Sequence, residues 1–202
     1  YRYLRPSEIC QSRLAARYIA DMDACFDTYS AMLPAMMDWA QSLARHGFER
    51  IYWLNGHGGN IATITAAFSE IYHGVSFDRS GANHPPLRCS LRNWWELPGV
   101  MDVCRQLFPV GEGSHATPSE VSVTWFGYPH AVKHVAMSPR IAPTGPILDA
   151  DDYRRRFPDG RIGSDPSQAS IEAGEKIVAA AVKSRMPNSP PARPMDGMIR
   201  VR

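Results

Sequence analysis

The sequence predicts a layered α/β domain with a mainly parallel sheet, and three features along the chain predict it. An apolar stripe at three- and four-residue spacing runs from residue 30 to 46, as in a helix with one buried face. A short, β-prone and largely apolar run over residues 48–54 predicts a buried strand. This run ends at a glycine-rich loop, residues 55–60, and a helical pattern follows over residues 61–72. Helix, strand, loop and helix in this order are typical of parallel strands alternating with helices.

The first helix has a clear end signal, because Gly47 suits a left-handed C-terminal cap. The remaining predicted elements are, in chain order, a strand within residues 87–95 and helices over 101–107, from Thr117 onward and over 171–183.

Length and composition predict one globular domain. The chain has 202 residues, 44% of them hydrophobic and 21% charged, which excludes the disordered and fibrous classes. We expect a single domain over residues 1–185, within which residues 1–29 are divergent or incomplete. Residues 186–202 are rich in proline and are expected to form a flexible tail. Because the chain opens with Tyr1 instead of Met, we expect its natural N-terminus to be missing.

Charge and cysteine usage narrow the class of partner. The formal net charge is only +2, and the one basic run, residues 154–156, lies beside Asp151 and Asp152, which predicts a solvated helix face. We therefore expect no nucleic-acid partner. The four cysteines are widely spaced without a CxxC pair, which predicts reduced thiols and a cytoplasmic protein. No apolar stretch approaches the roughly 20 residues that span a bilayer, so no membrane partner is expected.

The glycine-rich loop, Asn55-Gly-His-Gly-Gly-Asn60, is the first candidate site. Ligands of α/β sheets bind at the carboxyl ends of strands, and the next helix points unpaired N–H groups at the same place. We expect the glycines to permit positive φ angles and His57 to turn toward that pocket. Two alternatives stay open: a tight strand-to-helix turn, or a phosphate cradle, although neither nucleotide motif is present.

The second candidate site is the polar stretch over residues 111–120. Thr117 as N-cap, Pro118 in the first helical position and Glu120 in the first turn predict a capping box, which stabilises a helix by about 1 kcal/mol. Alternatively, His115 and Glu120 bind a metal or move protons at the mouth of this helix. One carboxylate oxygen cannot serve both roles, but a carboxylate has two.

These two motifs, NGHGGN at residues 55–60 and SHATPSE at residues 114–120, together resemble the central motifs of the creatininase (creatinine amidohydrolase) family. The resemblance extends from about residue 30 to residue 184 and includes the late stretch RRRFPDGRIGSDP. Within that stretch Arg161 has two interpretations: it holds a substrate carboxylate, or it pairs with a neighbouring aspartate.

The resemblance implies a three-layer α/β/α fold, a homo-oligomer, often a hexamer, and a two-metal site with zinc or manganese. Paired metals activate a water that hydrolyses a C–N bond in a small, often cyclic, amide. By the same resemblance His57 and Glu120 are metal ligands, Glu120 also takes part in catalysis, and His115 shuttles protons to the leaving nitrogen. The expected substrate-binding residues are Asn55, Gly58, Gly59 and Asn60.

Three departures from the family pattern bear on function. Gly59 stands where creatininase itself has a glutamate, which points away from creatinine as substrate. Thr117 and Pro118 replace the usual Gly-Glu of the second motif. The family's N-terminal Glu-x-His motif, followed by an aspartate, has no counterpart here. Two alternatives to an active enzyme follow: a truncated or catalytically silent relative that acts as a ligand-binding oligomer, and a phosphate-binding α/β module.

Overall fold

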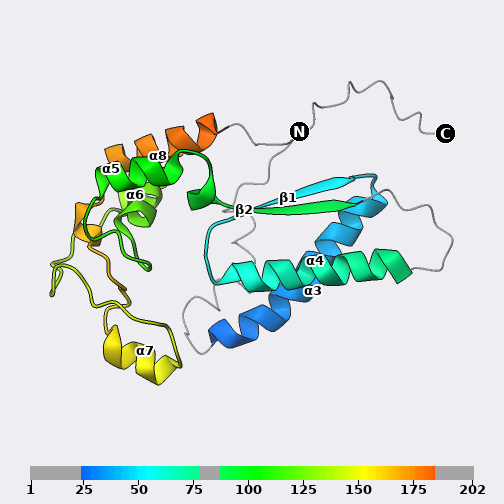
Figure 1. The fold of residues 1–202 in the computed structure, drawn as a ribbon, viewed down its shortest axis with the longest axis horizontal. Coiled ribbons are helices and arrows are strands. Elements are labelled where there is room, and N and C mark those ends of the chain that lie inside the picture. The colour runs from blue at the N-terminus through cyan, green and yellow to red at the C-terminus, as the bar shows by residue number, and fades with distance from the viewer. Residues whose placement is uncertain (1–23, 78–86, 185–202) are drawn as a thin grey trace. The chain divides into compact units, whose positions relative to one another are not determined.

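The structure, a computed structural model, describes residues 24–77 and 87–184, which fall into two compact units (Figure 1). Of the described residues, the first unit takes in 24–77, 87–96 and 142–162, and the second takes in 97–141 and 163–184. The predicted flexible tail, and the divergent N-terminal stretch as far as residue 23, lie outside the described residues.

Helices and parallel strands alternate in the first unit, as predicted. Strands β1 and β2 pair in parallel, with Arg50 opposite Arg88 and Asn55 opposite Asn93. The helix expected from residue 30 begins earlier, at residue 24, and Gly47 behind it has the expected positive φ, 85°. The elements are α3 (Ala24–Arg45), β1 (Arg50–Asn55), α4 (Asn60–Phe77), β2 (Arg88–Asn93), the 3-10 turn η1 (Trp94–Glu96) and α7 (Ala150–Arg156).

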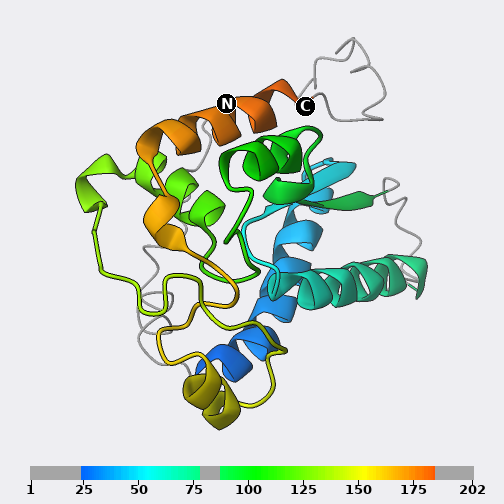
Figure 2. The ribbon, with the colours of Figure 1, turned by 60° about the vertical axis from the view of Figure 1, so that its left-hand side comes forward.

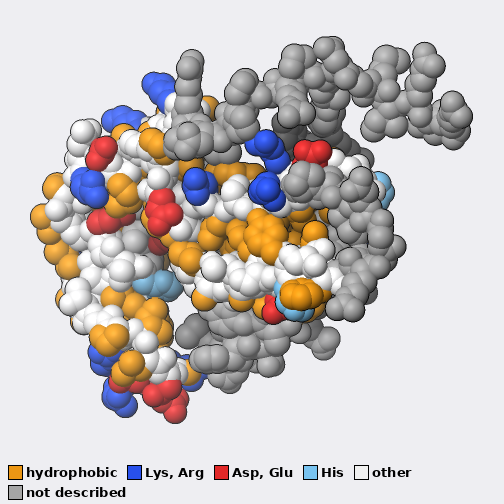
Figure 3. All heavy atoms as spheres, turned by 45° about the vertical axis from the view of Figure 1, so that its right-hand side comes forward, with side chains coloured by type: hydrophobic (Ala, Val, Ile, Leu, Met, Phe, Trp, Pro, Cys, Tyr) orange, Lys and Arg blue, Asp and Glu red, His pale blue; other side chains and the backbone are white. Residues whose placement is uncertain are grey.

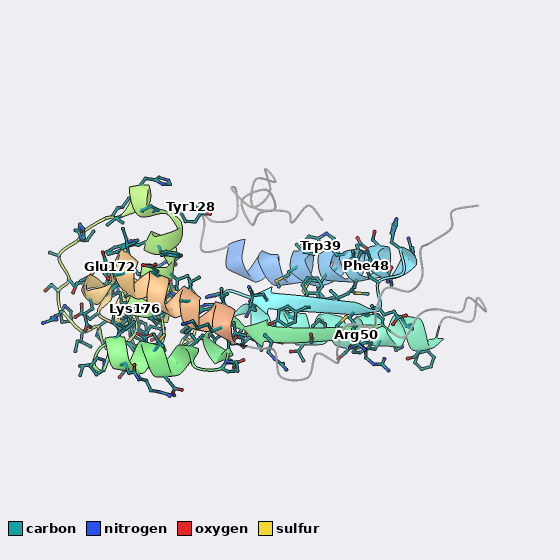
Figure 4. The ribbon with its side chains drawn as sticks, turned by 90° about the horizontal axis from the view of Figure 1, so that it is seen from above. Trp39, Phe48, Arg50, Tyr128, Glu172 and Lys176 are labelled. Atoms are coloured by element: carbon teal, nitrogen blue, oxygen red, sulfur yellow. The ribbon has the colours of Figure 1, made fainter. Side chains whose placement is uncertain are left out.

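Both long helices of this unit pack on one side of the two strands (Figure 1). Ala40 of α3, Ile51 of β1 and Ile71 of α4 share one buried cluster. Trp39 of α3, which is half exposed and is labelled in Figure 4, stacks on Trp53 of β1 with ring centroids 6.1 Å apart. The prediction of a fully buried strand was wrong, since β1 alternates between buried and exposed residues. Helices of the described unit cover only one face of the strands, which leaves Leu54 62% exposed.

On the edge of β2 that does not pair with β1, a side chain satisfies the backbone N–H and carbonyl of Cys89. The hydroxyl of Tyr72, on α4, accepts a hydrogen bond from the Cys89 N–H (2.7 Å) and donates one to the Cys89 carbonyl oxygen (3.3 Å). A free strand edge exposes unpaired backbone groups that invite pairing with other chains. Tyr72 therefore satisfies the β2 backbone where no third strand of the described residues does.

In α7, Arg154 and Arg155 have the solvated setting that the sequence predicts, whereas Arg156 is half-buried over the ring of Phe157. The Asp149 side chain caps the helix by accepting hydrogen bonds from two backbone N–H groups. Arg155 and Arg156 both bind Asp152, and Arg155 is 71% exposed. The two pairs are three and four residues apart on one helix and share the half-buried Asp152, while the Arg155 side faces solvent, which keeps the contribution of that pair at a few tenths of a kcal/mol.

Arg161 is buried, and the structure gives it an aspartate partner. Its side chain is 3% exposed and binds Asp159 through two nitrogens, at 2.8 and 2.7 Å. The hydrogen bond from Arg161 holds the pKa of Asp159 below its usual value. The ion-pair interpretation of this residue is therefore the one that the geometry supports.

The second unit is a helical cluster (Figure 2). Its last helix, α8, has the bounds that the sequence predicts. The helix expected from Thr117 onward is α6, and Thr117 is its N-cap. Ser122 joins the two longest helices: its hydroxyl donates to the Pro118 carbonyl (2.6 Å) and accepts from the Ser170 N–H (3.2 Å). The elements are α5 (Val100–Leu107), α6 (Pro118–Gly127), α8 (Ile171–Lys183) and the 3-10 turns η2 (Pro129–Ala131) and η3 (Pro166–Gln168).

The surface carries charges of both signs. On the face shown in Figure 3, Lys and Arg side chains lie singly or in small groups among acidic and apolar side chains. Glu172 and Lys176 follow each other along α8 (Figure 4). Within the described residues no helix is long and apolar enough to cross a membrane. Cys89 and Cys104 are free thiols.

Candidate functional site

The side chain of Asn55 organises the first loop. Asn55 ends β1 and is 4% exposed. Its Nδ2 donates to the His57 carbonyl oxygen (2.7 Å), and its Oδ1 accepts from the His57 backbone N–H (3.2 Å). The same Oδ1 also accepts from Nδ2 of Asn60, the first residue of α4 (3.2 Å). One buried amide therefore fixes the backbone of His57 on both sides, while the His57 residue itself stays exposed.

Two residues that the sequence analysis missed complete this network. Asn93 ends β2 beside Asn55, and its Oδ1 accepts from the Asn55 Nδ2 (2.7 Å). The Asn93 Nδ2 in turn donates to Oε2 of Glu96 (2.8 Å). An asparagine at the end of each of two adjacent parallel strands was the available signal, because such ends meet at one edge of a sheet. The network makes Asn55 a loop-positioning residue.

The expectation of positive φ angles in this loop was wrong. Glycines with positive φ occur elsewhere in the described chain, but not at Gly56, Gly58 or Gly59. A Cβ built on Gly56 or Gly58 would meet nothing within 4 Å. The loop obtains its shape from the Asn55 amide, and space remains open beside it. Substrate binding by Gly58 and Gly59 stays a prediction.

The second motif forms the predicted capping box. The Glu120 N–H donates to the Thr117 hydroxyl oxygen (3.1 Å), and the Thr117 N–H donates back to the Glu120 carboxylate (3.1 Å), with Pro118 in the first turn. Both hydrogen bonds from Thr117, including one from its hydroxyl at 3.2 Å, go to the same oxygen, Oε2. No hydrogen bond from the described residues reaches Oε1 of Glu120. Capping thus uses one carboxylate oxygen of Glu120, Oε2, and not the other.

Glu112 is a second carboxyl group in the polar stretch over residues 111–120, and the sequence analysis did not single it out. Its Oε1 accepts a short hydrogen bond from the Ser119 hydroxyl, while its buried Oε2 has no partner among the described residues. Burial raises the pKa of Glu112, and the charge of Glu120 raises it further, against the hydrogen bond from Ser119. Burial, and next the charge of Glu112, raise the pKa of the Cys104 thiol to about 11. The stretch over residues 111–120 therefore holds two carboxyl groups, Glu112 and Glu120, and Glu112 is harder to ionise than an ordinary glutamate.

We expect Glu112→Gln to raise the free energy of unfolding relative to wild type by more at pH 8 than at pH 4. The pKa of Glu112 is higher in the folded than in the unfolded state, so the folded state loses stability as the pH rises from 4.5 through the folded pKa. Glutamine removes this loss and keeps the acceptor for Ser119. Urea unfolding of both proteins at the two pH values measures the effect. A difference in unfolding free energy between variant and wild type that is the same at both pH values contradicts the prediction.

The donor set of the described residues falls short of a metal centre. A catalytic zinc has three protein ligands as a rule, and a two-metal centre has more. Within the described residues no group of three or more His, Cys, Asp and Glu side chains is placed to hold a metal ion. His57 belongs to the first unit and His115 and Glu120 to the second, so neither unit brings all three together.

Comparison with known proteins decides the family. The family model described as creatinine amidohydrolase matches residues 23–186, most of the chain. The chain belongs to the creatininase family. No curated protein matches the chain.

Solved creatininase structures share its fold. A crystal structure of creatinine amidohydrolase is 23% identical, with a TM-score of 0.64 over 77% of this chain. A structure named creatininase Mn is 24% identical with a TM-score of 0.61, and a mutant creatininase of Zn-Zn type is 24% identical with a TM-score of 0.60. The likeness confirms the predicted creatininase-like α/β fold. The chain spans 61% of the length of each of these three structures.

Proposed function

We propose that this creatininase-family chain takes part in the metal-dependent hydrolysis of a C–N bond in a small, often cyclic, amide. Family membership supports the reaction class, and the names of two neighbours, in manganese and zinc forms, support a divalent metal. The observation that carries the proposal is Glu120, whose Oε2 is used in capping while Oε1 is not. A carboxylate held by its own helix N-terminus is oriented before any ligand arrives.

The proposed roles follow from how each side chain is held. His57 and Glu120 each supply one metal ligand, His57 from a loop that Asn55 fixes and Glu120 from the first turn of α6. His115, which is half-buried and lies five residues before Glu120, transfers a proton to the leaving nitrogen of the amide. The remaining metal ligands have to come from residues other than His57 and Glu120.

We further propose that the chain forms a homo-oligomer, and sedimentation measures the oligomeric state directly.

Metal content of the purified protein tests the reaction class. About two zinc or manganese ions per chain, as in a two-metal hydrolase, together with hydrolysis of an amide from a panel of lactams and cyclic ureides, support the proposal. Metal near zero and no hydrolysis support the alternative of a catalytically silent relative.

We expect His57→Ala to lower the bound metal to near zero, since an exposed imidazole on a fixed loop is replaced by a methyl group. Elemental analysis after dialysis without chelator measures this. His73→Ala is the matched control, because His73 lies exposed on α4 against Phe77 and outside both motifs. Metal content that is equal in His57→Ala, His73→Ala and wild type removes His57 from the ligand set.

A further inference from the structure

The stretch RIGSDP, residues 161–166, is buried throughout. All residues from 161 to 166 are buried, and Ser164 and Asp165 are 0% and 1% exposed. Ser and Asp are mostly exposed in proteins, so full burial of both needs partners that satisfy them. Within the second unit, those partners lie in the loop that carries His115.

Two hydrogen bonds join this stretch to the loop, and a third comes from Gln168 of η3, which follows the stretch. The Ser164 hydroxyl donates to the His115 carbonyl oxygen (2.7 Å), the Asp165 N–H donates to the Gly111 carbonyl (2.7 Å), and the Gln168 side chain donates to the Val110 carbonyl (2.9 Å). All three acceptors are backbone carbonyls of residues 110–115. The bonds therefore hold the path of the loop, whatever its side chains do.

The stretch that donates these bonds is itself anchored. The Asp165 carboxylate, buried, accepts from Arg140 at 2.8 Å and caps η3 through the N–H of Ser167 at 3.3 Å. A donor that is fixed on its own side restrains its acceptor more than a mobile one does, because less freedom is left to lose. Ser164 thus presents its hydroxyl from a rigid support.

The loop needs such a restraint next to His115. Gly111 and Gly113 have φ of 80° and 68°, and Ala116 has φ of 52°, the only non-glycine with positive φ in the described chain. The left-handed region is unfavourable for alanine and persists where surrounding contacts hold it. The carbonyl that Ser164 binds belongs to the peptide plane between His115 and Ala116. Fixing this plane sets the torsion beside each residue, and with it the direction in which the His115 side chain leaves the backbone.

We propose that Ser164 is a positioning residue for His115: its hydroxyl fixes the His115–Ala116 peptide and so aims the imidazole. The importance of this aim for turnover rests on the proposed function, in which His115 transfers a proton. The adjoining Thr117 N–H binds Glu120, so the same restraint extends to the first turn of α6. A displacement of about 1 Å at a reacting group lowers a rate by up to about 100-fold.

The test compares Ser164→Ala with Ser122→Ala. Both serines are 0% exposed, both lie in the second unit, and both donate to a backbone carbonyl, but the partners of Ser122, Pro118 and Ser170, lie outside the loop of residues 110–115. In Ser164→Ala we expect amide exchange of residues 111–117 to become roughly 5- to 10-fold faster, as loss of one net hydrogen bond allows. The His115 ring signals should shift or broaden in NMR spectra. In Ser122→Ala exchange in this loop and the His115 signals should stay as in wild type.

Turnover gives a second readout. On a panel amide that wild type hydrolyses, Ser164→Ala should lower kcat by about 10- to 100-fold with KM nearly unchanged, since a misaimed acid affects the chemical step more than binding. If Ser164→Ala does not fold, Ser164→Cys, similar in volume and a weaker donor, takes its place with smaller changes in the same direction. Unchanged exchange and ring signals overturn the proposal, as does a kcat equal to that of wild type. If wild type hydrolyses nothing, the proposed function fails, while exchange and ring signals still decide the role of Ser164.

Discussion

Replacing Asn55 with aspartate is expected to unfold the first unit at a clearly lower urea concentration and to remove hydrolysis. The Asn55 Nδ2 donates to the Asn93 side-chain oxygen and to the His57 carbonyl, both at 2.7 Å. Aspartate has no donor when ionised, so two acceptors lose their partner and face a negative charge in a buried position. Each unsatisfied buried group costs about 1–3 kcal/mol, so a loss of about 3 kcal/mol in unfolding free energy is expected.

Asn60→Asp provides the control for this prediction. Asn60 makes one hydrogen bond in the same network, a 3.2 Å bond to the Asn55 Oδ1, and it is only half-buried. Its replacement is expected to cost about 1 kcal/mol, the net value of one hydrogen bond. If both variants unfold at the same urea concentration, the Asn55 amide does not organise the loop. If Asn55→Asp is destabilised but keeps wild-type metal content, the loop and the metal site are independent.

Local patterns predicted the elements that depend on near neighbours. The bounds of α8 follow from helical periodicity and a serine cap, which act within about four residues. Thr117 and Glu120, which form the capping box, are three residues apart, so the residue types at these two positions are enough to predict it. The start of α3 was misplaced by six residues, because the polar pair Asp27 and Thr28 separates the apolar residues at its beginning from the apolar stripe that follows. Helix ends are also the part of an element that a sequence pattern locates least well.

Contacts between distant parts of the chain were beyond such patterns. Asn55 and Asn93 are 38 residues apart, and Ser164 and His115 are 49 apart. The asparagine at the end of each strand indicates a shared sheet edge but not this contact, and nothing local to Ser164 or His115 specifies the other, since the pairs form only when strands pair or when a loop folds back. Glu112 is similar, because its raised pKa comes from burial, which the fold sets. The prediction of positive φ angles at the loop glycines was wrong for the opposite reason. The glycines suggest left-handed torsions, but the Asn55 side-chain amide holds the loop without them.

Gly174→Ala is expected to destabilise the second unit by about 3 kcal/mol or more, beyond the common range for overpacking. Gly174 lies inside α8, where alanine is intrinsically favoured over glycine by about 1 kcal/mol. A Cβ at this position would lie 2.6 Å from the Ser122 carbonyl carbon and 2.7 Å from the Phe126 Cβ, with the Ser122 oxygen closer still. These atoms belong to α6 backbone or to the base of a side chain, so no rotamer change relieves the clash. Either the two helices separate or the unit does not fold.

Gly127→Ala is the matched control, because Gly127 ends α6 and a Cβ there would meet nothing within 4 Å. Alanine at such an open position is expected to leave stability unchanged or raise it by about 0.5 kcal/mol. Thermal and urea unfolding of the two variants therefore separate helix propensity, which acts at both sites, from helix contact, which acts only at Gly174. Ser122→Ala should not rescue Gly174→Ala, because the clash is with the backbone of Ser122 and not with its hydroxyl. Wild-type stability in Gly174→Ala shows that α6 and α8 pack less closely than the structure places them.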